Sequence, residues 1–155
     1  MDEKNISFIS GNTKFNIRVA IWIEFNGKVL LETNGKFWNM IGGRVHFGES
    51  TCDAVHRELK EELGVDISEL ELINVSENFF EWMGRLQQEI LFVYRASIDD
   101  TYQFVRTNEF KCQDSDEVFK WHNKNDIYNL DCRPDIIKQL IKYDGQLFHS
   151  IKVDN

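Results

Sequence analysis

The sequence predicts an α+β fold in which helices pack against a mixed or antiparallel sheet. Residues 15–25 alternate between apolar and polar side chains, which is typical of a β-strand. Residues 50–64 instead repeat apolar side chains at helical spacing. Further strand-like runs and a second helical segment follow. This order of strands, helix, strands and helix favours an α+β architecture over a doubly wound parallel one.

The composition limits the kind of protein this is. The chain has 155 residues, 42% of them hydrophobic, which suits one domain over residues 1–155 and argues against intrinsic disorder. Its 18 Lys and Arg against 26 Asp and Glu give a formal net charge of −8. That charge argues against coating nucleic acid through a basic surface. It leaves a phosphorylated small molecule open as a partner, because bound cations reverse the local charge.

The cysteines and the apolar runs predict a cytoplasmic protein. Cys52, Cys112 and Cys132 lie far apart and form no CxxC pair, so we expect three reduced thiols rather than a zinc or dithiol site. The start of the chain lacks the basic segment and apolar stretch of a signal peptide. The longest apolar runs are far shorter than the ~20 residues of a membrane helix, so we expect no membrane contact.

The N-terminal half predicts a β-hairpin followed by a short glycine-containing segment. In residues 15–25 the odd positions are apolar, which predicts a strand with one buried face. Asn26-Gly27 suits a tight turn into a return strand over residues 28–33. Residues 38–45 form a short segment that contains Gly42 and Gly43.

The helix over residues 50–64 carries its own start and stop signals. Ser50 is a suitable N-cap, with Asp53 as a partial capping-box partner. Val55, Leu59 and Leu63 form one apolar stripe. Gly64 stands where a C-cap glycine belongs.

The C-terminal half predicts a second hairpin, a loop and a final helix. The strand-like runs cover residues 70–80 and 88–98, with a turn at residues 83–85 between them. Residues 108–117 are polar and acidic, which predicts a loop, and residues 118–121 form a short strand candidate. Pro134 suits the first turn of an amphipathic helix.

Three carboxylates on the first helix carry the chemical signal. Glu58, Glu61 and Glu62 are spaced i, i+3 and i+4, so they share one helix face and repel each other unless a cation binds. Oxygen ligands favour Mg²⁺ or Mn²⁺ over zinc. Because Mg²⁺ usually shares its shell with phosphate oxygens, the implied substrate is a phosphorylated small molecule. The alternative is a solvated acidic surface, which is the commoner role of such a face.

The surrounding residues resemble the signature of the Nudix hydrolases, the MutT-like family. The matching positions are Gly43, Glu49, Arg57, Glu58, Leu59, Glu61, Glu62, Gly64 and Val65. The resemblance implies an α/β/α sandwich with a mixed sheet and a loop-helix-loop catalytic motif. It also implies an enzyme, a pyrophosphohydrolase that uses Mg²⁺, or Mn²⁺, to cleave a pyrophosphate bond in a nucleoside diphosphate linked to another group. Nucleotide sugars, dinucleoside polyphosphates, ADP-ribose and nucleoside triphosphates all belong to that class.

The resemblance also assigns roles residue by residue. Glu58 and Glu62 look like the main metal ligands, with Glu61 as a ligand or acting through a metal-bound water. The carbonyl of Gly42 is similar to a backbone ligand in the family. The family usually has proline where this chain has Ile41, which affects loop geometry and removes no ligand.

The remaining catalytic roles concern orientation and proton transfer. Arg57 and Glu49 resemble a pair that orients the glutamates, the alternative being an ordinary surface salt bridge. Glu58 is one candidate for the carboxylate that accepts the proton of the attacking water. The other candidates lie in the acidic loop: Glu109, Asp114, Asp116 and Glu117.

Substrate contacts and partners are less sharply defined. Arg44 is a candidate for phosphate binding, and Phe80 and Trp82 are candidates for stacking on a base, with core packing or an ordinary surface position as the alternatives. A non-catalytic nucleotide-binding or regulatory protein on the same fold is the alternative function. By analogy with relatives, a homodimer is also an expectation.

Overall fold

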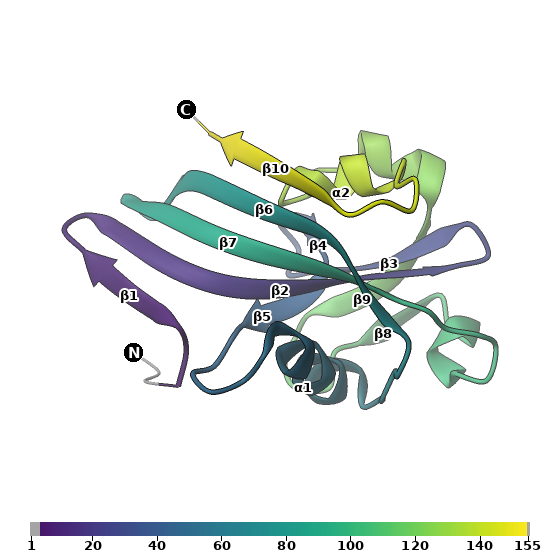
Figure 1. Ribbon diagram of the computed structural model, residues 1–155. Helices are drawn as coiled ribbons and strands as arrows, with labels where there is room; N and C mark the ends of the chain where they lie inside the picture. Colours follow the sequence, from purple (N-terminus) through teal and green to yellow (C-terminus); the bar gives the residue numbers. More distant parts are fainter. Residues whose placement is uncertain (1–3, 155) are drawn as a thin grey trace.

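The computed structural model describes residues 4–154 and contains a ten-stranded mixed sheet with helices on both sides. The strand order is β10-β6-β7-β2-β3-β9-β8, with β1 and β5 pairing with β2 and β4 pairing with β3 (Figure 1). The strands are β1 (Ser7–Ser10), β2 (Thr13–Phe25), β3 (Lys28–Thr33), β4 (Trp38–Asn39), β5 (Ile41–Arg44), β6 (Leu70–Trp82), β7 (Arg85–Ala96), β8 (Glu109–Lys111), β9 (Val118–Asn123) and β10 (Phe148–Val153). The helices are α1 (Thr51–Leu63), α2 (Ile136–Leu140) and the short 3₁₀ segments η1 (Gln103–Arg106) and η2 (Lys124–Asn129).

Strand β2 lies at the centre and is buried on both faces. Its odd residues, such as Ile21, pack in a cluster with Leu59 of α1, whereas its even residues, such as Trp22, pack in a second cluster with Ile137 of α2. The expectation of a single buried face was therefore wrong for the middle of this strand. A helix covers each face of the sheet at this point, so the side chains on both faces of the middle of β2 are buried.

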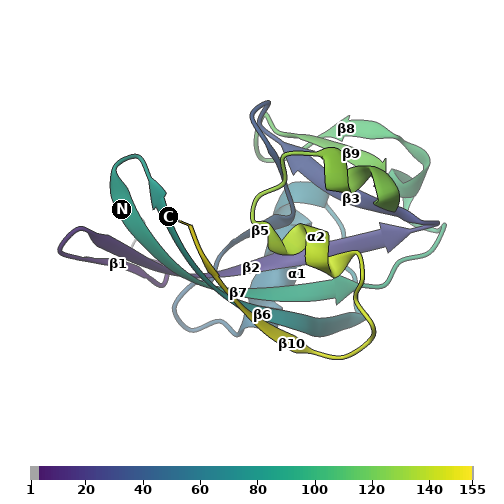
Figure 2. The same cartoon turned by 90° about the horizontal axis from the view of Figure 1, so that it is seen from above.

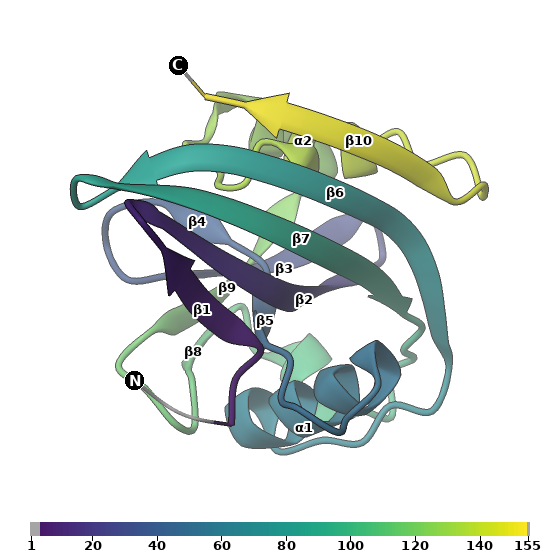
Figure 3. The same ribbon diagram turned by 60° about the vertical axis from the view of Figure 1, so that its left-hand side comes forward.

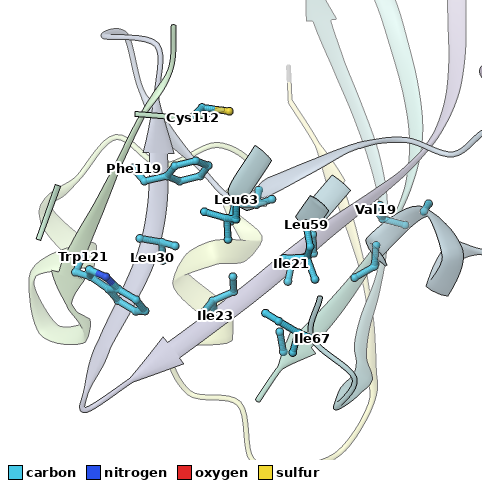
Figure 4. Packing of buried hydrophobic residues seen from close by; sticks show 14 of the residues in the cluster. Val19, Ile21, Ile23, Leu30, Leu59, Leu63, Ile67, Cys112, Phe119 and Trp121 are labelled. Atoms are coloured by element: carbon cyan, nitrogen blue, oxygen red, sulfur yellow. The ribbon is translucent and has the colours of Figure 1, made fainter. Parts of the chain in front are cut away.

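The two helices complete an α/β/α sandwich. Helix α1 lies beneath the curved sheet and α2 lies on its other side (Figures 1 and 3). Figure 4 shows Leu59 and Leu63 of α1 directed toward Ile21, Leu30 and Phe119 of the strands. The mixed sheet and the two helical layers confirm the predicted fold class.

The sheet forks beside α1, and this fork positions the candidate site. Strands β2 and β3 pair only next to their hairpin turn, at residues 24–25 and 28–29. Farther along β2, strand β5 takes the place beside it, while β3 turns away to pair with β4 and β9. In Figure 2 the tip of the β6–β7 hairpin lies at the opposite end from β3, β8 and β9.

Several element boundaries differ from the sequence predictions. The expected loop over residues 108–117 contains β8. This short strand is held by its antiparallel pairing with β9. The C-terminal helix is shorter than expected, and Pro134 precedes its cap Asp135 instead of lying in its first turn. Strand β10 was not predicted. It pairs in parallel with β6, a long-range contact that local pattern does not reveal.

Candidate metal and active site

Helix α1 holds the predicted glutamates in a fixed orientation. Its N-cap Ser50 accepts a hydrogen bond from the Asp53 amide and the Asp53 side chain accepts one from the Ser50 amide, so the predicted capping box is present. Gly64 ends the helix with φ 70°, the left-handed conformation that glycine adopts at little cost. The apolar stripe of α1 faces the sheet, which turns the adjoining acidic face toward the fork.

Arg57 connects the loop before α1 to the acidic face. Its Nε and Nη2 donate to the two oxygens of Glu49, at 3.1 and 2.7 Å, and Nη2 also donates to the carbonyl of Arg44 at 2.9 Å. Its Nη1 donates to Glu58 at 2.8 Å and to Glu61 at 3.4 Å. These bonds use all five N–H donors that a guanidinium has. The backbone amide of His46 also donates to Glu49, at 2.7 Å, so the loop and helix are joined through one carboxylate.

Glu58 lies against the backbone of β5. A Cβ atom built on Gly43 would overlap the Glu58 carboxylate, so this glycine is required for close approach and not for its φ angle. A Cβ on Gly42 would instead overlap the carbonyl of Val19 on β2. The pair of glycines therefore lets β5 lie close to β2 while the Glu58 carboxylate reaches over the strand.

Glu62 faces the other branch of the fork, where it meets a residue that the sequence did not reveal. One ligand atom from each of Glu62, Glu32 of β3 and Cys112 lies within 4.8 Å of the others. Glu32 ends a run of buried apolar residues in a strand, and its burial gave no separate signal in the sequence. All three side chains are buried.

The surroundings of these carboxylates disfavour their ionised forms. Burial raises the pKa of Glu62, and the charge of Glu58 raises it further, whereas a hydrogen bond from the Gly42 backbone opposes the change. Burial and the charge of Glu62 raise the pKa of Glu32 strongly. Burial also raises the pKa of Glu58, although its hydrogen bond with Arg57 opposes that effect.

Two buried carboxylate oxygens of this cluster are suited to binding a cation. Within residues 4–154, Oε2 of Glu32 and Oε2 of Glu62 are buried and have no hydrogen-bond partner. Unpaired buried carboxylate oxygens are costly unless a proton or a cation binds them. Burial raises the pKa of the Cys112 thiol to about 11, so without a metal its sulfur stays protonated at neutral pH, and the two unpaired atoms of the cluster are both carboxylate oxygens. The set is therefore mainly an oxygen site, which suits a hard divalent cation.

The acidic loop contributes some of its predicted members and not others. Glu117 is a neighbour of Glu32, and its negative charge raises the pKa of that carboxyl. Asp114 lines a cavity together with Glu58 and Glu61. Glu109 and Asp116 are exposed. The structure thus brings Asp114 and Glu117 to the acidic face and leaves Glu109 at the start of β8, opposite Lys120.

The predicted substrate-binding residues occupy two separate places. Arg44 lines the same cavity as Glu58 and Glu61, with a volume of about 520 Å³. Phe80 and Trp82 lie at the far end of β6, next to the hairpin turn, and line neither this cavity nor a second one beside the end of α1. Their role in stacking stays a prediction.

Comparisons with known proteins identify the family of this chain. The family model described as NUDIX domain matches residues 14–143. The chain belongs to the Nudix family. A curated relative, the uncharacterized Nudix hydrolase YvcI of Bacillus subtilis (strain 168), is 30% identical over 115 residues, which cover 72% of this chain and 68% of the relative.

Solved structures share the Nudix fold. A MutT protein from Bacillus halodurans superposes with a TM-score of 0.68 at 18% identity and covers 88% of this chain and 89% of its own. The NUDIX domain of NrtR from Shewanella oneidensis, solved in complex with ADP ribose, gives a TM-score of 0.55 at 18% identity and covers 83% of this chain and 84% of its own.

Family membership confirms the prediction of an enzyme, a Nudix pyrophosphohydrolase. Within the part of the chain that the structure describes, no helix has the length and apolar character needed to cross a bilayer.

Proposed function

We propose that this Nudix protein is a Mg²⁺-dependent hydrolase of a pyrophosphate bond in a nucleoside diphosphate linked to another group, with Mn²⁺ as a substitute metal. The observation that carries the proposal is the buried carboxylate cluster at the fork, where Glu32 and Glu62 each keep an unpaired oxygen among the described residues. A cluster of this kind is stable when a divalent cation neutralises it.

The residues that would hold the cation come from both branches of the fork. Glu58 and Glu62 supply carboxylates from α1, and Glu32 adds one from β3. Glu61, which is more exposed, takes part directly or through water, and the carbonyl of Gly42 is a backbone ligand. When bound, Mg²⁺ lowers the pKa of a coordinated water and offsets the charge of phosphate oxygens.

The other side chains orient the metal-binding carboxylates, bind phosphate or accept a proton. Arg57 holds Glu58 and Glu61 on one side and Glu49 on the other, so it fixes the helix face relative to the preceding loop. Arg44 lies in the adjoining cavity. Its guanidinium group would attract the phosphate oxygens of the substrate there. The proton of the attacking water passes to a carboxylate, for which Glu58, Asp114 and Glu117 are placed near the cluster.

A substrate panel tests the proposal. Purified protein is incubated with ADP-ribose, NADH, nucleotide sugars, nucleoside triphosphates, oxidised nucleotides and dinucleoside polyphosphates, with Mg²⁺, with Mn²⁺ and with chelator. We expect at least one compound to release a phosphorylated product with metal and none to do so with chelator. Binding without turnover of any compound would support the alternative, a nucleotide-binding or regulatory protein.

The cysteines bear on the compartment in which the protein works. The three cysteines are free, as expected of a protein in a reducing compartment, and we propose a cytoplasmic location. We also propose a single domain, and a homodimer remains a prediction for a mass measurement in solution.

A further inference from the structure

Basic side chains gather beside the carboxylate cluster. The cavity of about 520 Å³ next to Glu58 and Glu61 is also lined by basic residues, and these are Lys4, Arg18, Arg44, His46 and Arg57. The chain as a whole carries a net charge of −8, so this gathering is a local departure from the general balance. Cationic side chains that are grouped at a cleft attract anions to it.

Two of these arginines lie directly opposite each other. Arg18 of β2 and Arg44 of β5 are cross-strand neighbours in the antiparallel register. Like charges in that position destabilise a sheet. Arg18 forms an ion pair with Glu89 at 3.3 Å, and Glu89 also accepts a hydrogen bond from Asn78.

The positive charge continues along the same face of the sheet. Lys14 precedes Arg18 by four residues on β2, so both side chains point to one face. Lys14 is opposite Gln87 of β7, and Arg85, two residues before Gln87, shares that face. Burial lowers the pKa of Lys14, and the positive charges of Arg44, Arg85 and Arg18 lower it further.

Arg44, Arg18, Lys14 and Arg85 form a basic row. This row is longer than the contact surface of a single phosphate. At about 3.3 Å per residue, Arg18 and Lys14 lie roughly 13 Å apart along the strand. The row begins in the cavity that contains Glu58 and continues toward the β6–β7 hairpin. Its positive charges are therefore arranged in a line that starts at the candidate metal site.

We propose that Arg44, Arg18, Lys14 and Arg85 bind the phosphates of a chain that extends past the bond cleaved at the metal site. The substrate class is then nucleoside oligophosphates with more than two consecutive phosphates. This inference rests on the proposed function, since it assigns the substrate of the same site. A diphosphate compound would fill the metal site without extending along β2 to Lys14 and Arg85.

The first experiment varies only the length of the phosphate chain. Diadenosine di-, tri-, tetra- and pentaphosphate have identical ends, so differences in kcat/KM report on the phosphates between them. We expect kcat/KM to rise at least about tenfold from the diphosphate to the tetraphosphate, because each added phosphate gains charge-assisted hydrogen bonds. Equal values across the series would overturn the inference.

Matched variants assign the effect to the row. In Arg18→Gln/Lys14→Gln the rise with chain length should fall by about tenfold or more. The control Arg106→Gln/Lys142→Gln removes the same charge from exposed positions outside the row and should keep the rise. Lys14→Gln alone guards against misfolding, because neutralising a side chain surrounded by like charges relieves repulsion. It should show a smaller loss in the same direction.

Binding without turnover separates this inference from the proposed function. Calorimetry with inorganic tripolyphosphate, pyrophosphate and a short single-stranded oligonucleotide is carried out without divalent metal. Tripolyphosphate should bind the native protein about tenfold more tightly than the double variant. If neither the diadenosine compounds nor any other compound of the substrate panel is hydrolysed while this difference persists, the proposed function fails and the phosphate-binding row stands. Equal binding to both proteins, or a preference for the oligonucleotide, overturns the row.

Discussion

Arg57 and Glu49 form a bidentate pair that connects the loop before α1 to the acidic face of the helix. The two bonds measure 2.7 and 3.1 Å, and the guanidinium continues to Glu58 at 2.8 Å. An ordinary surface salt bridge would leave part of the guanidinium in water, whereas this one places every N–H against protein oxygen. The geometry therefore favours an orienting role for the pair over the surface alternative.

Breaking that pair should reduce activity more than stability. In Glu49→Gln, Arg57 loses its charged anchor and the position of Glu58 is less fixed. We expect kcat to fall roughly 10- to 100-fold while KM changes little, because a misplaced carboxylate affects the reacting geometry. The free energy of unfolding should fall by about 1–2 kcal/mol. Steady-state kinetics and urea denaturation measure both quantities. Arg57→Lys should also lower kcat, because lysine keeps the charge but lacks the planar fork.

The same pair should make stability depend on pH. The hydrogen bonds from Arg57 hold the pKa of Glu49 below its ordinary value. The unfolded chain therefore binds this proton first as the pH falls, so the pair's contribution is complete above the ordinary pKa near 4.3 and is lost below it. Urea midpoints between pH 3 and 7 should fall more steeply for the native protein than for Glu49→Gln. Parallel curves would show that the pair contributes no pH dependence.

Glu58 and Glu62 should respond differently to neutralisation. Both Glu→Gln variants should lose activity by a factor of about 10² or more if they hold the metal. Glu62→Gln should raise the melting temperature of the metal-free protein, because burial and the Glu58 charge penalise its ionised form. Glu58→Gln should not, because it gives up a charge-assisted bond with Arg57. Thermal denaturation in chelator tests the contrast, and a lower melting temperature for Glu62→Gln would contradict it.

Glu32 should matter for metal binding despite lying outside the signature. Adding Mn²⁺ at about 100 times its dissociation constant should stabilise the native protein by about 2.7 kcal/mol. In Glu32→Gln that gain should be much smaller, because one of the carboxylates near Glu62 is lost. Glu109→Gln is the matched control, as this residue is exposed on β8. An equal gain in all three proteins would exclude Glu32 from the site.

The sequence predicted the parts of the site that depend on local spacing. Helix α1, its Ser50 cap and the Gly64 stop follow from short-range pattern. The Arg57–Glu49 pair was implied by the resemblance to the Nudix signature, and its two residues do lie within hydrogen-bonding distance. Glu32 followed from neither, because its partners lie on α1 and in the loop before β9 and meet it only through the fork of the sheet. The same limit applies to β10, whose partner β6 is far away in the chain. Burial of β2 on both faces likewise depends on α2, which a local alternation cannot report.

Gly42 and Gly43 are adjacent, yet alanine should harm them in opposite ways. At Gly43 the new methyl group meets the end of the Glu58 side chain, which can move aside. Gly43→Ala should therefore fold with a loss of about 1 kcal/mol or less but lose most of its activity, since the carboxylate is displaced. At Gly42 the methyl group meets the backbone carbonyl of Val19, which is held in the sheet. Gly42→Ala should lose more than about 2 kcal/mol of stability, because β5 must separate from β2. Urea denaturation and kinetics on both variants test the contrast. Full activity in Gly43→Ala would mean that the Glu58 carboxylate has no fixed place over β5.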